Sequence, residues 1–250
     1  MADTWILLRG LIREKRHWES FPEVLQQQHP DKRIIAIDVA GNGERYNETS
    51  PLSIRGLMES ARSRLHQRGI FGPYNLIAIS MGAMISLEWL VEYPKEVEQA
   101  VLMNTSLRAF NPFYDRLQPH NYRTIVKSMV TLSRYQRERR ILAITSNLRQ
   151  DHDSIARRWA QYAKENPTSR ANALRQLTAA ARYKAPKHAP HNRILILNGG
   201  KDRLVHPSCS INLAHNWQLP FKQHPEAGHD LALDDCDWVV EHLSGFFNHH

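Results

Sequence analysis

The sequence predicts an α/β fold, with a mostly parallel sheet of about six strands that is flanked by helices and interrupted by an inserted helical segment. Short, continuously apolar segments alternate with segments of helical periodicity, which is typical of parallel strands covered on both faces. Nearly ninety residues, about 104–193, separate the fourth apolar segment from the fifth. Because ordinary crossovers are far shorter, this stretch is predicted to be an insertion.

Six apolar segments are the expected strands. The first five are short, rich in aliphatic residues and bounded by polar or turn-forming residues, as buried strands are, and the sixth is more polar. In chain order they are residues 5–9, 33–38, 74–80, 99–104, 193–198 and 219–225.

Four further segments are expected to be helices that flank the sheet. Leu57, Ala61 and Leu65 recur on one face of residues 53–67, as in an amphipathic helix. Pro22 makes the start of the first helix uncertain, and Asp234 or Asp235 can cap the last one. The remaining three are expected at residues 17–28, 82–93 and 237–247.

The insertion is the basic part of the chain. The net charge is +8 over 250 residues, yet residues 111–190 hold 16 Lys and Arg against 5 Asp and Glu, and the remainder has a net charge of −3. We therefore predict a core formed by residues 1–110 and 186–250, and a helical cap with a surface role of its own. The cap, residues 111–185, should lie over the carboxyl edge of the sheet, with helices at 122–136, 154–165 and 169–184.

Cysteine usage and hydropathy bear on the compartment. Cys209 and Cys236 are the two cysteines; they are interpreted as packing residues in a reducing environment. The N-terminal WILL is far too short for the core of a signal peptide, and no apolar stretch approaches a membrane span. The expectation is a cytoplasmic protein without a membrane-spanning segment.

Chemistry-bearing residues follow three of the expected strands. In parallel sheets ligands bind outside the carboxyl ends of the strands, where Ser80, Asp202 and His229 fall in that order. A serine hydroxyl needs an adjacent base to act as a nucleophile. Taken alone, Ser80 could instead be a helix N-cap, Asp202 a turn residue and His229 a core histidine. Asp38, which ends the second strand, is an alternative acid.

Together these residues resemble the α/β-hydrolase family. Its nucleophile elbow reads Gly-x-Ser-x-Gly, in the chain order serine, acid, histidine, and here residues 78–82 read Ala-Ile-Ser-Met-Gly. The resemblance covers nearly the whole chain, and the basic insertion takes the place of the family's cap. Alanine for the first glycine is a mild departure, since only a small side chain is required there.

The resemblance implies a serine hydrolase that cleaves a carboxylic ester or thioester through an acyl-enzyme, with a carboxylesterase as the first choice. Ser80 would be the nucleophile, His229 the base and Asp202 the acid that orients it. The backbone N–H groups of Met81 and Leu11 would form the oxyanion hole. No cofactor or metal is expected: the histidines lack zinc spacing, and the glycines at 41–43 lack the third glycine of a dinucleotide loop.

Arg9 is the sharper departure, because the family has histidine at this place. Arg9, Arg13 and Arg16 could together receive a substrate carboxylate; alternatively they face solvent or pair with Glu14 and Asp38.

Other residues are candidates for the substrate pocket. Residues 104–106, beginning with Asn104, could touch substrate, and Asp230 is interpreted as a turn or pocket-wall residue. Phe110, Phe113 and Tyr114 suit an apolar acyl chain, or else pack the cap onto the core.

Three alternatives stay open at this point. The same fold could serve a lyase or a ligand-binding scaffold without hydrolysis. A nucleic-acid binder is disfavoured, since no recognised motif accompanies the basic charge. The small-molecule ester could also arrive on an acidic carrier protein that docks on the basic cap, although a solvated cationic face explains the same charge.

Overall fold

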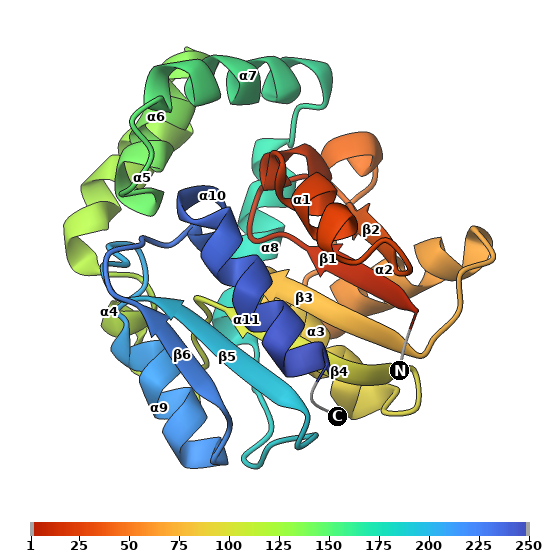
Figure 1. The fold of residues 1–250 in the computed structure, drawn as a ribbon. Helices are drawn as coiled ribbons and strands as arrows, with labels where there is room; N and C mark the ends of the chain where they lie inside the picture. The colour runs from red at the N-terminus through yellow and green to blue at the C-terminus, as the bar shows by residue number, and fades with distance from the viewer. Residues whose placement is uncertain (1–2, 249–250) are drawn as a thin grey trace.

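The computed structural model describes residues 3–248. Its six strands form one sheet in the order β2-β1-β3-β4-β5-β6, and every neighbouring pair is parallel. The predicted fold class is therefore confirmed (Figure 1). The strands are β1 (Thr4–Leu8), β2 (Arg33–Ile37), β3 (Tyr74–Ile79), β4 (Val97–Met103), β5 (Ile194–Gly199) and β6 (Phe221–His224).

Alternate residues of each central strand pack on opposite faces of the sheet, because successive side chains of a strand point to opposite sides. Ile6 and Leu76 belong to a core cluster with α2 (Ile54–Gln67), α3 (Met81–Glu92) and α9 (Ser208–Trp217). Their neighbours Leu7 and Ile77 belong to the cluster with α1 (Phe21–Gln28) and α11 (Cys236–Asn248). In Figure 1, α1 and α11 accordingly lie in front of the sheet. An apolar layer thus covers each face of the sheet, which supports the residues at the carboxyl ends of the strands.

Side chains cap the starts of α2 and α11. The Ser53 hydroxyl accepts a hydrogen bond from the Gly56 N–H at the start of α2, and Asp235 accepts one from Trp238 at the start of α11. The first helix begins at Phe21, not at residue 17, with Pro22 in its first turn, where its missing N–H is harmless. Residues 15–18 form a short 3-10 helix instead, η1 (Lys15–Trp18). The sequence interpretation missed α9 and the short helix α10 (Leu231–Asp234).

The segment between β4 and β5 is helical, and we call residues 113–182 the helical insertion. In Figure 1, α5, α6 and α7 arch beyond the end of the sheet where the strands finish. The prediction of a single helix at 122–136 is wrong, because the helix is interrupted at residues 131–133. The Ser133 hydroxyl caps α6 by accepting a hydrogen bond from the Gln136 N–H. The insertion contains α4 (Phe113–Arg116), η3 (Pro119–Asn121), α5 (Tyr122–Val130), α6 (Arg134–Thr145), α7 (His152–Glu165) and α8 (Arg170–Arg182).

Both cysteines are free thiols, Cys209 buried and Cys236 half-buried. None of the helices within residues 3–248 combines the length and the apolar composition needed to cross a bilayer.

Candidate active site

Ser80 occupies a strained turn between β3 and α3. Its φ of 57° and ψ of −118° lie in a region that non-glycine residues rarely adopt. The turn is held from β4 and from the loop that follows it, because the Ser80 N–H donates to Met103 O at 2.9 Å and the Thr105 hydroxyl donates to Ser80 O at 3.1 Å. This conformation displays a hydroxyl at the start of a helix, as a nucleophile elbow does.

Small residues make room for the turn. A methyl group at Gly82 would lie 2.3 Å from Leu8 O, and one at Gly10 would lie 3.1 Å from the Ser80 Cβ. The loop after β1 therefore runs against the serine. Ala78 is fully buried in the core cluster, where its methyl group is housed without displacing the turn.

The imidazole of His229 is paired with Asp202. Its Nδ1 lies 2.7 Å from Asp202 Oδ2, and both side chains are buried. The other carboxylate oxygen accepts the N–H groups of Leu204 and Val205 at 2.8 and 3.0 Å. These bonds fix the position of the carboxylate. Because a carboxylate accepts hydrogen bonds, the Nδ1 of His229 carries the proton, and the lone pair of Nε2 stays free to accept another.

Asp38, the alternative acid, performs a different task. It accepts the backbone N–H groups of Lys15 at 2.6 Å and Glu44 at 3.0 Å, and so clamps two loops. Burial raises the pKa of Asp38 to about 6. The carboxylate that meets His229 is that of Asp202.

Asn104 was expected near the substrate, but the structure buries it completely behind the acid. Its amide donates to Asp202 Oδ2 at 3.1 Å and to Gly228 O at 2.9 Å, and its oxygen accepts the Gly199 N–H at 3.1 Å. Its φ of 46° is a conformation that asparagine tolerates better than most residues. An asparagine directly after a buried strand is the sequence signal for such a role.

The two residues expected to supply the oxyanion-hole N–H groups lie in the segments next to Ser80. Met81 is the first residue of α3, so its N–H has no carbonyl within its own helix. Leu11 follows Gly10, which lies against the serine side chain. Within residues 3–248, no hydrogen bond joins the Ser80 hydroxyl to His229.

Arg9 is not a free cation facing the pocket. It forms a buried, two-pronged ion pair with Asp230, at 2.9 and 2.6 Å, and its guanidinium lies 4.7 Å from the Trp18 ring centre. Neither Glu14 nor Asp38 is its partner. The pair ties the residue before Gly10 to the residue after His229, and thus joins the two loops that flank Ser80.

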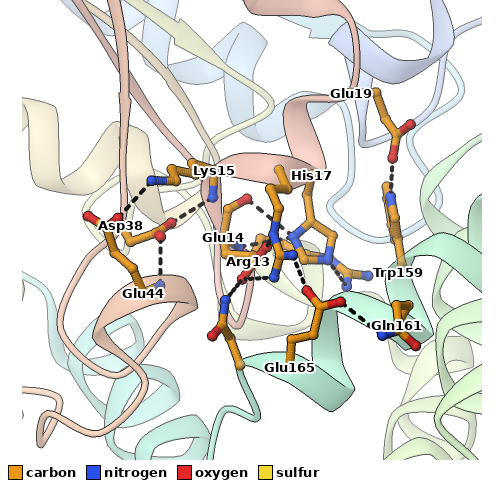
Figure 2. A network of polar contacts seen from close by, with 12 residues as sticks. Arg13, Glu14, Lys15, His17, Glu19, Asp38, Glu44, Trp159, Gln161 and Glu165 are labelled. Atoms are coloured by element: carbon orange, nitrogen blue, oxygen red, sulfur yellow. Dashed lines mark hydrogen bonds and ion pairs between the residues drawn. The ribbon is translucent and has the colours of Figure 1, made fainter.

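The other two arginines connect the loop after β1 to the helical insertion, and Figure 2 shows Arg13 of this loop near Trp159 and Glu165 of α7. Arg13 pairs with Glu138 of α6 at 2.6 Å and stacks on Trp159 of α7, whereas Arg16 pairs with Glu14 and with Glu165 of α7.

His17 lies among these cations. Burial, followed by the charges of Arg13 and Arg9, holds the pKa of His17 well below its usual value, so that His17 is neutral. Its ring meets Trp159 edge-on, at 4.7 Å between centroids.

The three aromatic candidates divide into two kinds. Phe110 is partly buried and meets the Trp217 ring of α9 at 5.6 Å, so it packs against the core just before the insertion begins. Phe113 and Tyr114 in α4 are 55 % and 60 % exposed. Only these two keep the accessibility that a ligand-binding side chain needs. Within residues 3–248, no group of three His, Cys, Asp or Glu side chains could hold a metal ion.

Comparisons with known proteins bear on the family and the fold. The sequence profile described as "alpha/beta hydrolase fold" matches residues 5–235. A homoserine O-acetyltransferase of Deinococcus radiodurans is 25% identical over 284 aligned positions, covering 98% of this chain and 82% of that protein. Another, from Pelobacter propionicus, is 36% identical over 67 residues, which are 26% of this chain and only 18% of that enzyme.

Solved structures show the same fold at low identity. A thermophilic esterase of Thermogutta terrifontis superposes with a TM-score of 0.76 at 17% identity, covering 98% of this chain and 89% of that one. The 2-hydroxy-6-oxo-6-phenylhexa-2,4-dienoate hydrolase BphD of Rhodococcus sp. strain RHA1 gives 0.77 at 18%, with 98% and 90% covered. With a matching profile over most of its length, this chain belongs to the α/β hydrolase fold family.

Proposed function

We propose that the protein cleaves a carboxylic ester or thioester through an acyl-enzyme, with Ser80 as nucleophile, His229 as general base and Asp202 as the acid that orients it. The observation that carries the proposal is the strained Ser80 turn at the same sheet edge as the 2.7 Å pairing of His229 with Asp202. A strained serine and a buried, oriented imidazole have no evident purpose in packing.

The chemistry follows from these positions. His229 Nε2 takes the proton of the Ser80 hydroxyl as its oxygen attacks the substrate carbonyl. The N–H groups of Met81 and Leu11 stabilise the oxyanion of the tetrahedral intermediate. Its collapse expels the alcohol or thiol, which receives the proton from His229. Water then repeats the sequence and releases the acid.

Transfer of the acyl group to an alcohol is the second candidate. The similarity to a homoserine O-acetyltransferase over nearly the whole chain favours it. Both reactions share the acyl-enzyme and differ in the acceptor. Incubation with acetyl-CoA, with and without homoserine, separates them: acetate alone indicates hydrolysis, and O-acetylhomoserine indicates transfer.

A fluorophosphonate probe tests the shared step. Folded wild-type protein should be labelled and should hydrolyse p-nitrophenyl acetate, and Ser80→Ala should lose both, with activity falling by several powers of ten. Asp202→Asn should be severely impaired, while Asp38→Asn keeps most of its activity. An unlabelled wild-type protein would favour a ligand-binding scaffold, and a labelled Ser80→Ala would remove Ser80 from the mechanism.

A further inference from the structure

Gln176, on α8 of the helical insertion, reaches the loop that carries the oxyanion-hole N–H. It is fully buried, and its Oε1 accepts the Ile12 N–H at 3.0 Å across 164 residues of sequence. We propose that Gln176 is a positioning residue, which holds the Leu11 N–H in the direction that the oxyanion requires. The inference rests on the proposed function, since it assigns a task within the same site.

The loop needs such a restraint. Ile12 has a φ of 60°, a left-handed conformation that is costly for a β-branched residue. Its N–H belongs to the peptide plane that directly follows Leu11, so fixing this N–H fixes the orientation of that plane. The Leu11 N–H lies in the preceding peptide plane, which is joined to this one through the Leu11 Cα alone. Because Gly10 lies against the Ser80 side chain, anchoring the plane after Leu11 limits how far the plane that carries the Leu11 N–H can turn.

A second arm of the network grips the same loop. The Gln176 amide nitrogen donates to Asn42 Oδ1 at 2.8 Å and to the Ser50 hydroxyl at 3.0 Å. Asn42 in turn donates to Arg13 O at 3.0 Å. Gln176 therefore restrains the loop on both sides of Ile12, and these donors all have acceptors, a condition under which a buried network is rigid. This orientation of the amide is set by Ile12, whose N–H can only donate.

Asn172 provides a matched comparison one turn earlier in α8. Its oxygen accepts the Ser50 N–H at 2.9 Å and its nitrogen donates to Glu48 O at 2.9 Å. Both residues thus fasten α8 to the core, but only Gln176 contacts the loop of residues 10–13. Any effect on catalysis beyond that of losing Asn172 reports on the loop.

The experiment compares three variants of the full chain with p-nitrophenyl acetate. Gln176→Met removes the acceptor at similar volume, Gln176→Glu keeps an acceptor oxygen for Ile12, and Asn172→Leu loosens α8 alone. We expect Gln176→Met to lower kcat about 10- to 100-fold, below the full loss of an oxyanion donor, with KM within about threefold. Gln176→Glu, which keeps the acceptor for Ile12 but loses the donor to Asn42 and Ser50, should recover part of kcat. Asn172→Leu should lower the thermal midpoint by a comparable amount. It should keep kcat within about threefold, because Asn172 does not contact the loop of residues 10–13 and its loss leaves the transition state intact.

Three results would overturn the proposal: Gln176→Met loses no more kcat than Asn172→Leu, it acts through KM alone, or Gln176→Glu is as slow as Gln176→Met. If Gln176→Met does not fold, Asn42→Leu removes the whole arm that runs from the Gln176 amide through Asn42 to Arg13, and an unchanged kcat would count against the inference. A wild-type protein that the fluorophosphonate does not label would overturn both proposals. A labelled wild type with an indifferent Gln176→Met would overturn this one only.

Discussion

At the scale of single residues, buried polar groups decide the form of the site. Asp202 and Asp38 are both buried carboxylates that accept two backbone N–H groups, yet only Asp202 also meets an imidazole. Arg9 of the loop after β1 and Asp230 of the loop that carries His229 neutralise each other in a buried ion pair. A buried charged group is tolerated only where it has such partners. The side-chain partners of Asp202 and Arg9 lie far away in the sequence, so no local sequence pattern predicts them.

The first prediction concerns Asp38 and pH. Because burial raises its pKa from 3.8 to about 6, the folded state binds this proton more tightly than the unfolded chain does. The stabilisation is complete below about pH 4 and is lost as the pH rises to about 6, which for a shift of about two units amounts to about 3 kcal/mol. Asp38→Asn removes this dependence.

Urea unfolding of wild type and Asp38→Asn at several pH values checks the sign. The free energy of unfolding of wild type, relative to the variant, should fall between about pH 4 and pH 6. Parallel pH profiles for the two proteins would contradict the prediction.

At the scale of elements, the loop after β1 and the helical insertion form one charged seam. Figure 2 shows its side chains: Arg13 and His17 from the loop, and Trp159 and Glu165 from α7. Glu19 extends the seam by accepting the Trp159 indole N–H at 2.5 Å. The insertion is therefore joined to the core next to Leu11, and its attachment bears on the geometry of the site.

The ion pairs of this seam should differ greatly in their contribution to the free energy of unfolding. Glu138 is 6 % exposed and Arg13 14 %, so Glu138→Leu leaves a guanidinium buried without a counterion and should cost about 3 kcal/mol of unfolding free energy or more. The pair of Arg16 with Glu165 is solvent-exposed, with side chains 31 % and 45 % accessible. Glu165→Leu should cost far less than Glu138→Leu, because solvent screens an exposed pair.

Urea titration of both variants measures the difference. Equal losses would show that the buried pair is no more important than the exposed one. Because the two glutamates meet neighbouring arginines of one loop, the comparison holds the location constant.

At the scale of the whole molecule, the charge is unevenly distributed. Residues 116–137 hold five Arg and Lys and no Asp or Glu. Arg137 pairs with the adjacent Glu138 at 3.2 Å, and Arg139 pairs with Asp153 at 2.5 Å. Bulky side chains are exposed on the same segment, up to 89 % at Leu132. This face combines positive potential with apolar contact area, and the acidic carrier protein stays a prediction for it.

Salt dependence tests whether this charge acts on substrates. If it does, kcat/KM for an ester with a terminal carboxylate should fall steeply as salt rises from about 0.1 to about 1 M, where the screening length drops from about 10 to about 3 Å. The matched uncharged ester should change little. Reversal of Lys127 and Arg134 to Glu should remove the difference between the two substrates. An equal response of both esters to salt would leave the charge without a role in substrate capture.

Much of the fold could be predicted because strands and helices are encoded by periodicity along the chain. The six strands, the helix of residues 53–67 and the order Ser80, Asp202, His229 are all visible as local patterns. Where prediction failed locally, the signal was present: Ser133 followed by Gln136 is a capping pattern that separates α5 from α6.

The sequence by itself determined the α/β class, the elbow around Ser80 and the presence of a basic helical insertion. Only the tertiary structure decided that Asp202 meets His229, that Asn104 lies behind the acid, that Arg9 pairs with Asp230 across 221 residues, and that Gln176 holds Ile12. Backbone periodicity is a local property and can be read from the sequence. The partner of a buried polar group is chosen instead by which segments meet when the chain packs, because each such group must recover in the fold the hydrogen bonds it loses with water.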